Sequence, residues 1–272
     1  MKLTKSNGDK GKGNSSSSKI GKICVSIPAD TPEALKTSIG YALDQGADII
    51  EVRFDYTSKD MVSDILYSID DKKDSMIFTC RRRDEGGKYD GSEHDRVSII
   101  KRLASFRPML VDVEYNTLLE NDELHDQLRA LNADLLVSYH NFKETPSLDN
   151  MLDTLNEISK RYSNNIKIVT MANSLDDNIK ILSLYKHITN NNNNNTNLIA
   201  FCMGEYGIAS RVLCTLLGSP FTYASLKDAL APGQLTIKQM RFIYEQIRYI
   251  SIDTGYISNE LLRLIEVAKG VR

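Results

Sequence analysis

Eight short apolar runs alternate with helical patterns along most of the chain, and this alternation restricts the fold more than any other feature. The runs are KICVSI (22–27), DIIEVRFD (48–55), SMIFTCR (75–81), MLVDVEY (109–115), DLLVSYH (134–140), IKIVTMA (166–172), NLIAFCMG (197–204) and PFTYAS (220–225). Nearly continuous apolar runs are typical of parallel strands that are covered on both faces. Eight strand–helix units therefore predict an α/β fold, a (β/α)8 TIM barrel of parallel strands. A doubly wound open sheet is the alternative, but no GxGxxG follows the first run.

Start signals precede several of the helical patterns between these runs. Thr31-Pro32-Glu33 provides an N-cap, a proline at the first helical position and an acidic first turn. It precedes Leu35, Ile39 and Leu43, which repeat every four residues and predict the apolar face of a helix. Later helices are predicted after Thr145-Pro146-Ser147, Ser174 and Thr236.

Two segments fall outside the repeating pattern. Residues 1–19 are rich in Ser, Gly and Lys and contain no apolar stretch, so we expect a disordered tail rather than a secretory signal. Residues 20–272 are then expected to form a single barrel domain. The six asparagines at 190–195 predict a mobile loop on the bottom face of the barrel, away from a site at the top.

The composition argues against several classes of function. Lys and Arg number 34 and Asp and Glu 36, and this near balance leaves no broad basic face for nucleic acid. No stretch approaches 18 consecutive apolar residues, so no membrane span is expected. The cysteines, Cys24, Cys80, Cys202 and Cys214, form no CxxC pair. They indicate reduced thiols in a cytoplasmic protein rather than disulfides or a zinc site, and the sequence predicts no metal site.

Charged side chains occur in runs that would otherwise suit a core, and in a barrel the active site lies at the carboxyl ends of the strands. The candidates there are Glu51, Arg53, Asp55, Arg81, Glu85, Asp112, Glu114, His140, Lys167 and Arg211. As a set they are hard to explain by structure alone. Taken singly the case is weaker: the residues at 51, 53 and 55 share one face and could line a solvated edge. His140 could be a buried histidine with satisfied hydrogen bonds.

Lys167 lies inside the apolar run of the sixth predicted strand. A charged ammonium is expensive to bury, so either the side chain reaches water or the site requires an amine of lowered pKa. His140 precedes it by about one βα unit, so the two residues should lie on neighbouring strands. A neutral amine attacks a ketone or aldehyde to give an imine, and a nearby histidine can then remove the acidified C–H proton. The pattern favours a Schiff-base lysine.

Seven motifs in order resemble the type I 3-dehydroquinate dehydratases, which act third in the shikimate pathway to chorismate and the aromatic amino acids. They are EVRFD, FTCR followed by EGG, DVE, SYHNF with a following TP, KIVTM, MGEYGIASR and APGQ, within residues 22–250. Two positions depart from the family pattern: Leu230 replaces a serine before APGQ, and Tyr223 replaces a phenylalanine.

The resemblance implies a role for each site residue. Lys167 would form the imine with the C3 ketone of 3-dehydroquinate. His140 would remove the C2 proton and protonate the departing C1 hydroxyl, and Glu85 would orient His140. Arg211 would clamp the substrate carboxylate. The ring hydroxyls and the polar rim would be bound by Gln234, Glu51, Arg53 and Arg81, and the pocket would be walled by Met203 and Tyr223. The family needs no cofactor and is often dimeric, so a homodimer is expected.

Three alternatives remain open at this point. One is another Schiff-base barrel of the class I aldolase kind that acts on a different keto substrate. The second is a non-catalytic relative that binds a shikimate-like ligand, although the intact Lys167, His140 and Glu85 argue against it. The third is that this domain is one module of a larger polypeptide.

Overall fold

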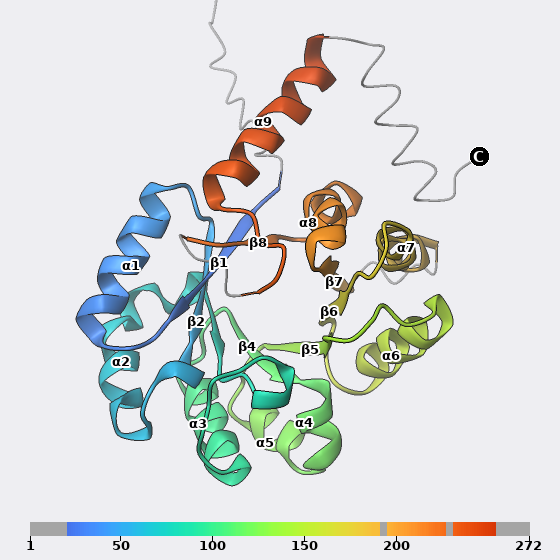
Figure 1. Ribbon diagram of the computed structural model, residues 1–272. Helices are drawn as coiled ribbons and strands as arrows, with labels where there is room; N and C mark the ends of the chain where they lie inside the picture. Colours follow the sequence, from blue (N-terminus) through green and yellow to red (C-terminus); the bar gives the residue numbers. More distant parts are fainter. Residues whose placement is uncertain (1–20, 191–194, 227–230, 254–272) are drawn as a thin grey trace, which may run out of the picture.

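The predicted strands are all present, and they form one parallel sheet that curls into a nearly closed barrel (Figure 1). The computed structural model describes residues 21–190, 195–226 and 231–253. The strands are β1 (Ile23–Pro28), β2 (Ile49–Arg53), β3 (Met76–Thr79), β4 (Leu110–Glu114), β5 (Leu135–Asn141), β6 (Asn165–Met171), β7 (Asn197–Met203) and β8 (Thr222–Ala224). Each pairs with its neighbour in sequence up to β7, and β8 returns to pair with β1. Within the described ranges no ladder joins β7 to β8. The predicted barrel class is confirmed.

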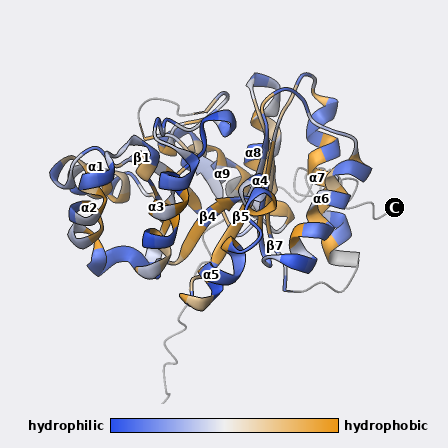
Figure 2. Cartoon of the chain, turned by 90° about the horizontal axis from the view of Figure 1, so that it is seen from below, coloured by the Kyte–Doolittle hydropathy of each residue, from blue (hydrophilic) through white to orange (hydrophobic). Residues whose placement is uncertain are grey.

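Helices surround this sheet, as Figure 1 shows. They are α1 (Pro32–Asp44), α2 (Val62–Ser68), α3 (Glu93–Ser105), α4 (Tyr115–Glu120), α5 (Leu124–Ala130), α6 (Leu148–Arg161), α7 (Asp176–Asn190), α8 (Ile208–Leu213) and α9 (Ile237–Asp253). Figure 2 shows hydrophobic residues along the strands and on parts of the helices, with polar residues on the rest. The predicted tail (1–19), most of the Asn run and Leu230 lie outside the described residues, so the domain boundaries stay a prediction.

The first helix illustrates how far the helical pattern could be used. Thr31 caps α1 as predicted, because its side chain accepts a hydrogen bond from the backbone N–H of Ala34. Leu35 and Ile39 are buried, but Leu43 is 46% exposed and Ala42 takes its place in the core. The expectation for Leu43 was wrong because a helix turns by about 100° per residue. Ala42, seven positions after Leu35, therefore returns to the same face of the helix. Leu43, eight positions after Leu35, has already turned away from it.

Buried apolar side chains of the strands and of the facing helices form the main core. All four cysteines are buried free thiols, as the sequence predicted. Along β6, Ile166 and Ile168 alternate with Lys167, so the isoleucines and the lysine point to opposite faces of the sheet. Lys167 is paired with Ser138 of β5, and His140 lies two residues further along β5. The prediction that His140 and Lys167 lie on neighbouring strands is confirmed.

Candidate active site

One cavity collects the ten residues to which the family resemblance gave a role in the site. Its lining comprises Ser26, Glu51, Arg53, Arg81, Glu85, Gly86, His140, Phe142, Lys167, Val169, Phe201, Met203, Arg211, Tyr223, Ala231 and Gln234. The strand residues among them lie from the middle to the carboxyl end of their strands, where barrel enzymes hold their sites.

Lys167 is buried and its ammonium is ion-paired. Its Nζ donates to Asp112 Oδ2 at 2.6 Å and lies 3.8 Å from Glu51 Oε1. The hydroxyl of Tyr223 is 3.4 Å away on another side. The sequence had suggested an apolar surrounding for this amine, and that expectation was wrong. Its apolar sequence neighbours face the other side of the sheet, while the barrel interior at this level is built from carboxylates and hydroxyls.

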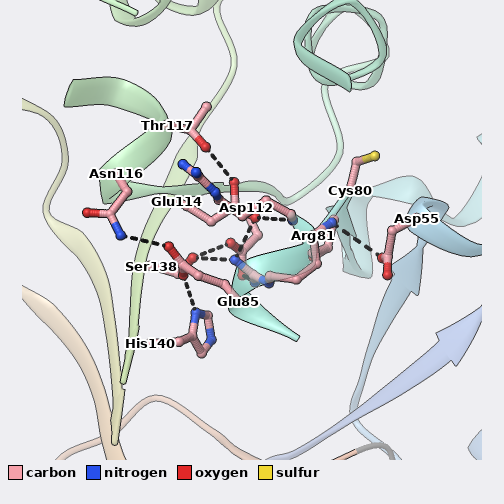
Figure 3. Close-up of polar contacts among 12 residues, drawn as sticks. Asp55, Cys80, Arg81, Glu85, Asp112, Glu114, Asn116, Thr117, Ser138 and His140 are labelled. Carbon is pink, nitrogen blue, oxygen red and sulfur yellow. Dashed lines mark hydrogen bonds and ion pairs between the residues drawn. The ribbon is translucent and has the colours of Figure 1, made fainter. Parts of the chain in front are cut away.

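Arg81 joins this ion pair to a second carboxylate. Its Nη2 donates to Asp112 Oδ2 at 2.7 Å, and its Nη1 donates to Glu114 Oε1 and to Ser138 Oγ (Figure 3). Burial acts to raise the pKa of Asp112, but Arg81 and Lys167 outweigh it and hold that pKa well below its ordinary value. Both terminal nitrogens of Arg81 are thus engaged with protein groups, although the residue also lines the cavity.

Lys167, Asp112, Glu51, Arg81 and Glu114 form a charged layer inside the barrel, and Arg96 extends it from outside. It comes from α3 and is 1% exposed. Its Nη1 donates to Glu114 Oε2 and to the carbonyl of Cys80, and its Nη2 donates to Thr117 Oγ1. A single arginine therefore fixes the end of β3, the end of β4 and the start of α4, the segments that carry Arg81 and Glu114.

His140 forms a pair with Glu85. Its Nδ1 is 2.9 Å from Glu85 Oε2, and Asn116 Nδ2 donates to the other oxygen of that carboxylate at 3.0 Å (Figure 3). Burial, and then Arg81 and Lys167, lower the pKa of His140 well below its ordinary value. Burial raises the pKa of Glu85 to about 7. The imidazole is therefore neutral near pH 7, which suits a general base.

The loop that carries Glu85 is held at both ends by Asp55. The Asp55 carboxylate accepts from the backbone N–H groups of Arg81 and Lys88, and it forms a bidentate pair with Arg53. Gly86 follows with φ +81°, and a Cβ at this position would approach the Phe142 ring to 2.6 Å. Phe142 in turn stacks on His140 at 6.3 Å between ring centroids.

Arg211 is a buried guanidinium with little to balance its charge. It is 1% exposed and stacks on the Phe201 ring at 4.4 Å from the centroid. Its Nη2 has one long contact, 3.4 Å to the carbonyl of Pro232, and its Nε has no partner among the described residues. Burial lowers the pKa of Arg211 to about 10. A desolvated, under-paired guanidinium that lines a cavity is a site for an anion.

The APGQ segment is fixed against the end of β7. Gly204 N–H donates to the carbonyl of Pro232 at 3.1 Å. Gly233 has φ +71°, and a Cβ there would lie 2.2 Å from the Gly204 carbonyl oxygen, so only glycine fits. Gln234 accepts from the backbone N–H of Ala231 and lines the cavity beside Met203.

Sequence reasoning gave no role to several residues that shape this site. Asp112 and Glu114 were noticed as carboxylates in DVE, and their period-two spacing already places them on one face. Asn116 and Arg96 carried no signal, because polar residues in helices usually face water. Among the described residues, no group of three or more His, Cys, Asp or Glu side chains could hold a metal ion. In the same part of the chain, every helix is too short or too polar to cross a bilayer.

Comparisons with known proteins point to one family. The sequence profile of Type I 3-dehydroquinase matches residues 23–251. The 3-dehydroquinate dehydratase of Dehalococcoides mccartyi strain 195 is 36% identical over 230 residues, which are 83% of this chain and 95% of that protein.

Solved structures of similar fold include the 3-dehydroquinate dehydratase of Aquifex aeolicus. It has a TM-score of 0.68 and 28% identity, with 83% of this chain and 98% of that chain covered. The type I enzyme of Clostridium difficile has a TM-score of 0.74 at 23% identity and covers 85% of this chain and 93% of that one, a likeness of fold.

Proposed function

The chain belongs to the type I 3-dehydroquinase family, and we propose that it dehydrates 3-dehydroquinate to 3-dehydroshikimate through an imine on Lys167. The observation that carries this mechanism is a buried lysine amine in the same cavity as a histidine–carboxylate pair and an under-paired arginine. These three features match the three needs of the reaction: a nucleophile, a base and an anchor for an anion.

Arg211 binds the carboxylate of the substrate. Its unpartnered Nε and weakly engaged Nη2 offer the two donors that a carboxylate accepts side by side. The carboxylate is the fixed negative charge of 3-dehydroquinate and is remote from the C3 ketone. Its position on Arg211 orients the ring so that C3 faces Lys167 and C2 faces His140.

Lys167 then forms the imine. The ammonium first gives up a proton, and Nζ attacks C3 of the ketone. The carbonyl oxygen leaves as water after two proton transfers in which His140 takes part. The protonated imine withdraws electrons from the adjacent C2–H bond, which becomes acidic enough for a histidine to deprotonate.

His140 removes the C2 proton, because its imidazole is neutral and its Nδ1 is bonded to Glu85, which leaves Nε2 as the base. The same proton is returned to the C1 hydroxyl, which departs as water and leaves a C1–C2 double bond. Hydrolysis of the imine consumes one water, releases the conjugated enone product and regenerates Lys167. Arg81 fixes Asp112 and Glu114, and because it also lines the cavity we expect it to contact a ring hydroxyl.

Borohydride trapping tests the proposal directly. Treatment with 3-dehydroquinate and borohydride should add one reduced adduct, which peptide mapping by mass spectrometry places on Lys167. Lys167→Ala should give no adduct, while Lys143→Ala, a change at an exposed lysine, should be labelled like the wild type. A panel of keto acids and sugar phosphates separates this reaction from an aldolase. An adduct on another lysine, or trapping only with an aldolase substrate, would overturn the assignment.

A further inference from the structure

Asn116 contacts the histidine–carboxylate pair from the side opposite His140. Its Nδ2 donates to Glu85 Oε1 at 3.0 Å, while Glu85 Oε2 lies 2.9 Å from His140 Nδ1. Figure 3 shows the three side chains in sequence, with the carboxylate in the middle. The mechanism described above uses His140 and Glu85 but gives Asn116 no part.

The position of Asn116 is fixed by its neighbours in α4. This helix begins directly after β4, and Thr117 is buried at its start. Thr117 Oγ1 accepts from Arg96 and donates to Glu114 Oε2 at 3.0 Å, so the first turn is tied to the charged layer. The amide of Asn116 therefore meets Glu85 from a rigid element rather than from a loop.

We propose that Asn116 is a positioning residue that acts on His140 through Glu85. By donating to Oε1 it favours the ionised carboxylate and leaves Oε2 as the acceptor for Nδ1–H. The imidazole then holds its proton on Nδ1, and the electron pair of Nε2 faces the cavity. This role rests on the proposed function, in which His140 is the base.

The charged groups that face the pair come from the β3–α3 segment, β4 and β6. They are Arg81, Arg82, Asp112, Glu114 and Lys167. Burial raises the pKa of Glu85 to about 7, Arg81 opposes that rise and Glu114 adds to it, and the hydrogen bond from Asn116 also opposes it. Removal of the Asn116 amide leaves every other group in place, so the pKa of Glu85 should rise further.

The added proton disables the base wherever it resides. If it is on the imidazole, both ring nitrogens are protonated. If it is on Glu85, the carboxyl donates to Nδ1, and a neutral ring then carries its own proton on Nε2. In both cases Nε2 has no free electron pair. The loss of Asn116 should therefore move the pH at which the base becomes available upward.

Asn116→Leu tests this with two readouts. The chain has four histidines, so the side-chain ¹⁵N signals of labelled protein can be assigned by comparison with His140→Gln. The Nε2 signal should change to the protonated form at a pH roughly one unit higher than in wild type, as expected for loss of a hydrogen bond to a charged group. The acid limb of kcat/KM should move by the same amount. Asn116→Asp places a second carboxylate beside Glu85, and the shift should be larger.

Two controls separate positioning from a structural effect. Asn121→Leu removes another amide of this segment, one that donates to the Thr117 carbonyl and not to Glu85, and should leave the His140 transition unmoved. In a Glu85→Gln background, Asn116→Leu should no longer shift the transition, because its effect is transmitted through the carboxylate.

The ¹⁵N titration needs no substrate, so it tests Asn116 even if the proposed function fails. An unshifted His140 transition in folded Asn116→Leu would overturn the inference. So would a shift of the same size in the Glu85→Gln background.

Discussion

Lys167 Nζ and Asp112 Oδ2 lie 2.6 Å apart inside the barrel, and both side chains are shielded from water. The carboxylate also accepts from Arg81, so one aspartate balances two cations. Removal of one partner from a buried ion pair is costly, because the remaining charge is left uncompensated.

Asp112→Asn should therefore destabilise the protein by about 3 kcal/mol and slow imine formation. Urea unfolding gives the free energy, and the rate of borohydride trapping reports the amine. Ser138→Ala is the matched control, since it removes a neutral hydroxyl that accepts from Arg81 and donates to Asp112 but leaves both charges and their pairing in place, and it should cost about 1.5 kcal/mol. Equal losses in the two variants would show that the ion pair does not hold this layer together.

Lys167→Ala should reduce dehydration by roughly 10³-fold or more, because Lys167 is the one lysine among the described residues that line the cavity. The barrel should still fold, since Asp112 retains Arg81 and Ser138 as partners. Circular dichroism checks the fold, and the absorbance of the conjugated enone product follows activity. Substantial turnover in a verified folded variant would rule out the covalent mechanism.

Arg211→Lys should lower kcat/KM by roughly 10- to 150-fold, the equivalent of about 1.5–3 kcal/mol for a charged hydrogen bond. Lysine keeps the charge but loses the planar fork that binds both carboxylate oxygens. Much of the loss should appear in KM, and Arg211→Ala should be worse because it also removes the counter-charge. Steady-state kinetics decides the matter, and wild-type behaviour of Arg211→Lys would transfer the anchor role to Arg53.

The raised pKa of Glu85 predicts that this side chain stabilises the folded protein more at low pH than at high pH. Its pKa rises from 4.5 to about 7 on folding, so between these values the folded protein holds a proton that the unfolded chain releases. This contribution to stability is fully present below about pH 4.5 and is lost as the pH rises through about 7, a change of roughly 3 kcal/mol. Glu85→Gln has no titrating group at this position. His140 is present in both proteins, and its lowered pKa acts on stability in the opposite direction below pH 6.5.

The stability advantage of wild type over Glu85→Gln should therefore shrink by about that amount between pH 5 and pH 8. Urea unfolding of both proteins at the two pH values measures the difference. A constant difference would mean that Glu85 titrates normally in the folded state.

The order of the strands could be predicted because it depends on local patterns and on the short connections of a barrel. The contacts between side chains inside the barrel could not be predicted from the sequence. Lys167 and Asp112 lie on strands that are not adjacent, so their contact depends on how far neighbouring strands are shifted along one another. A shift of one residue would turn either side chain to the other face. Glu85 was assigned by resemblance, since its position depends on a loop that Asp55 fixes from β2's end.

The charged layer has a further consequence for the imine. It pairs three cations with three carboxylates: Lys167, Arg81 and Arg96 with Glu51, Asp112 and Glu114. A protonated imine carries the same single positive charge as the ammonium that it replaces. The counter-charges are therefore already in place and need no rearrangement when the intermediate forms, the condition for electrostatic preorganisation.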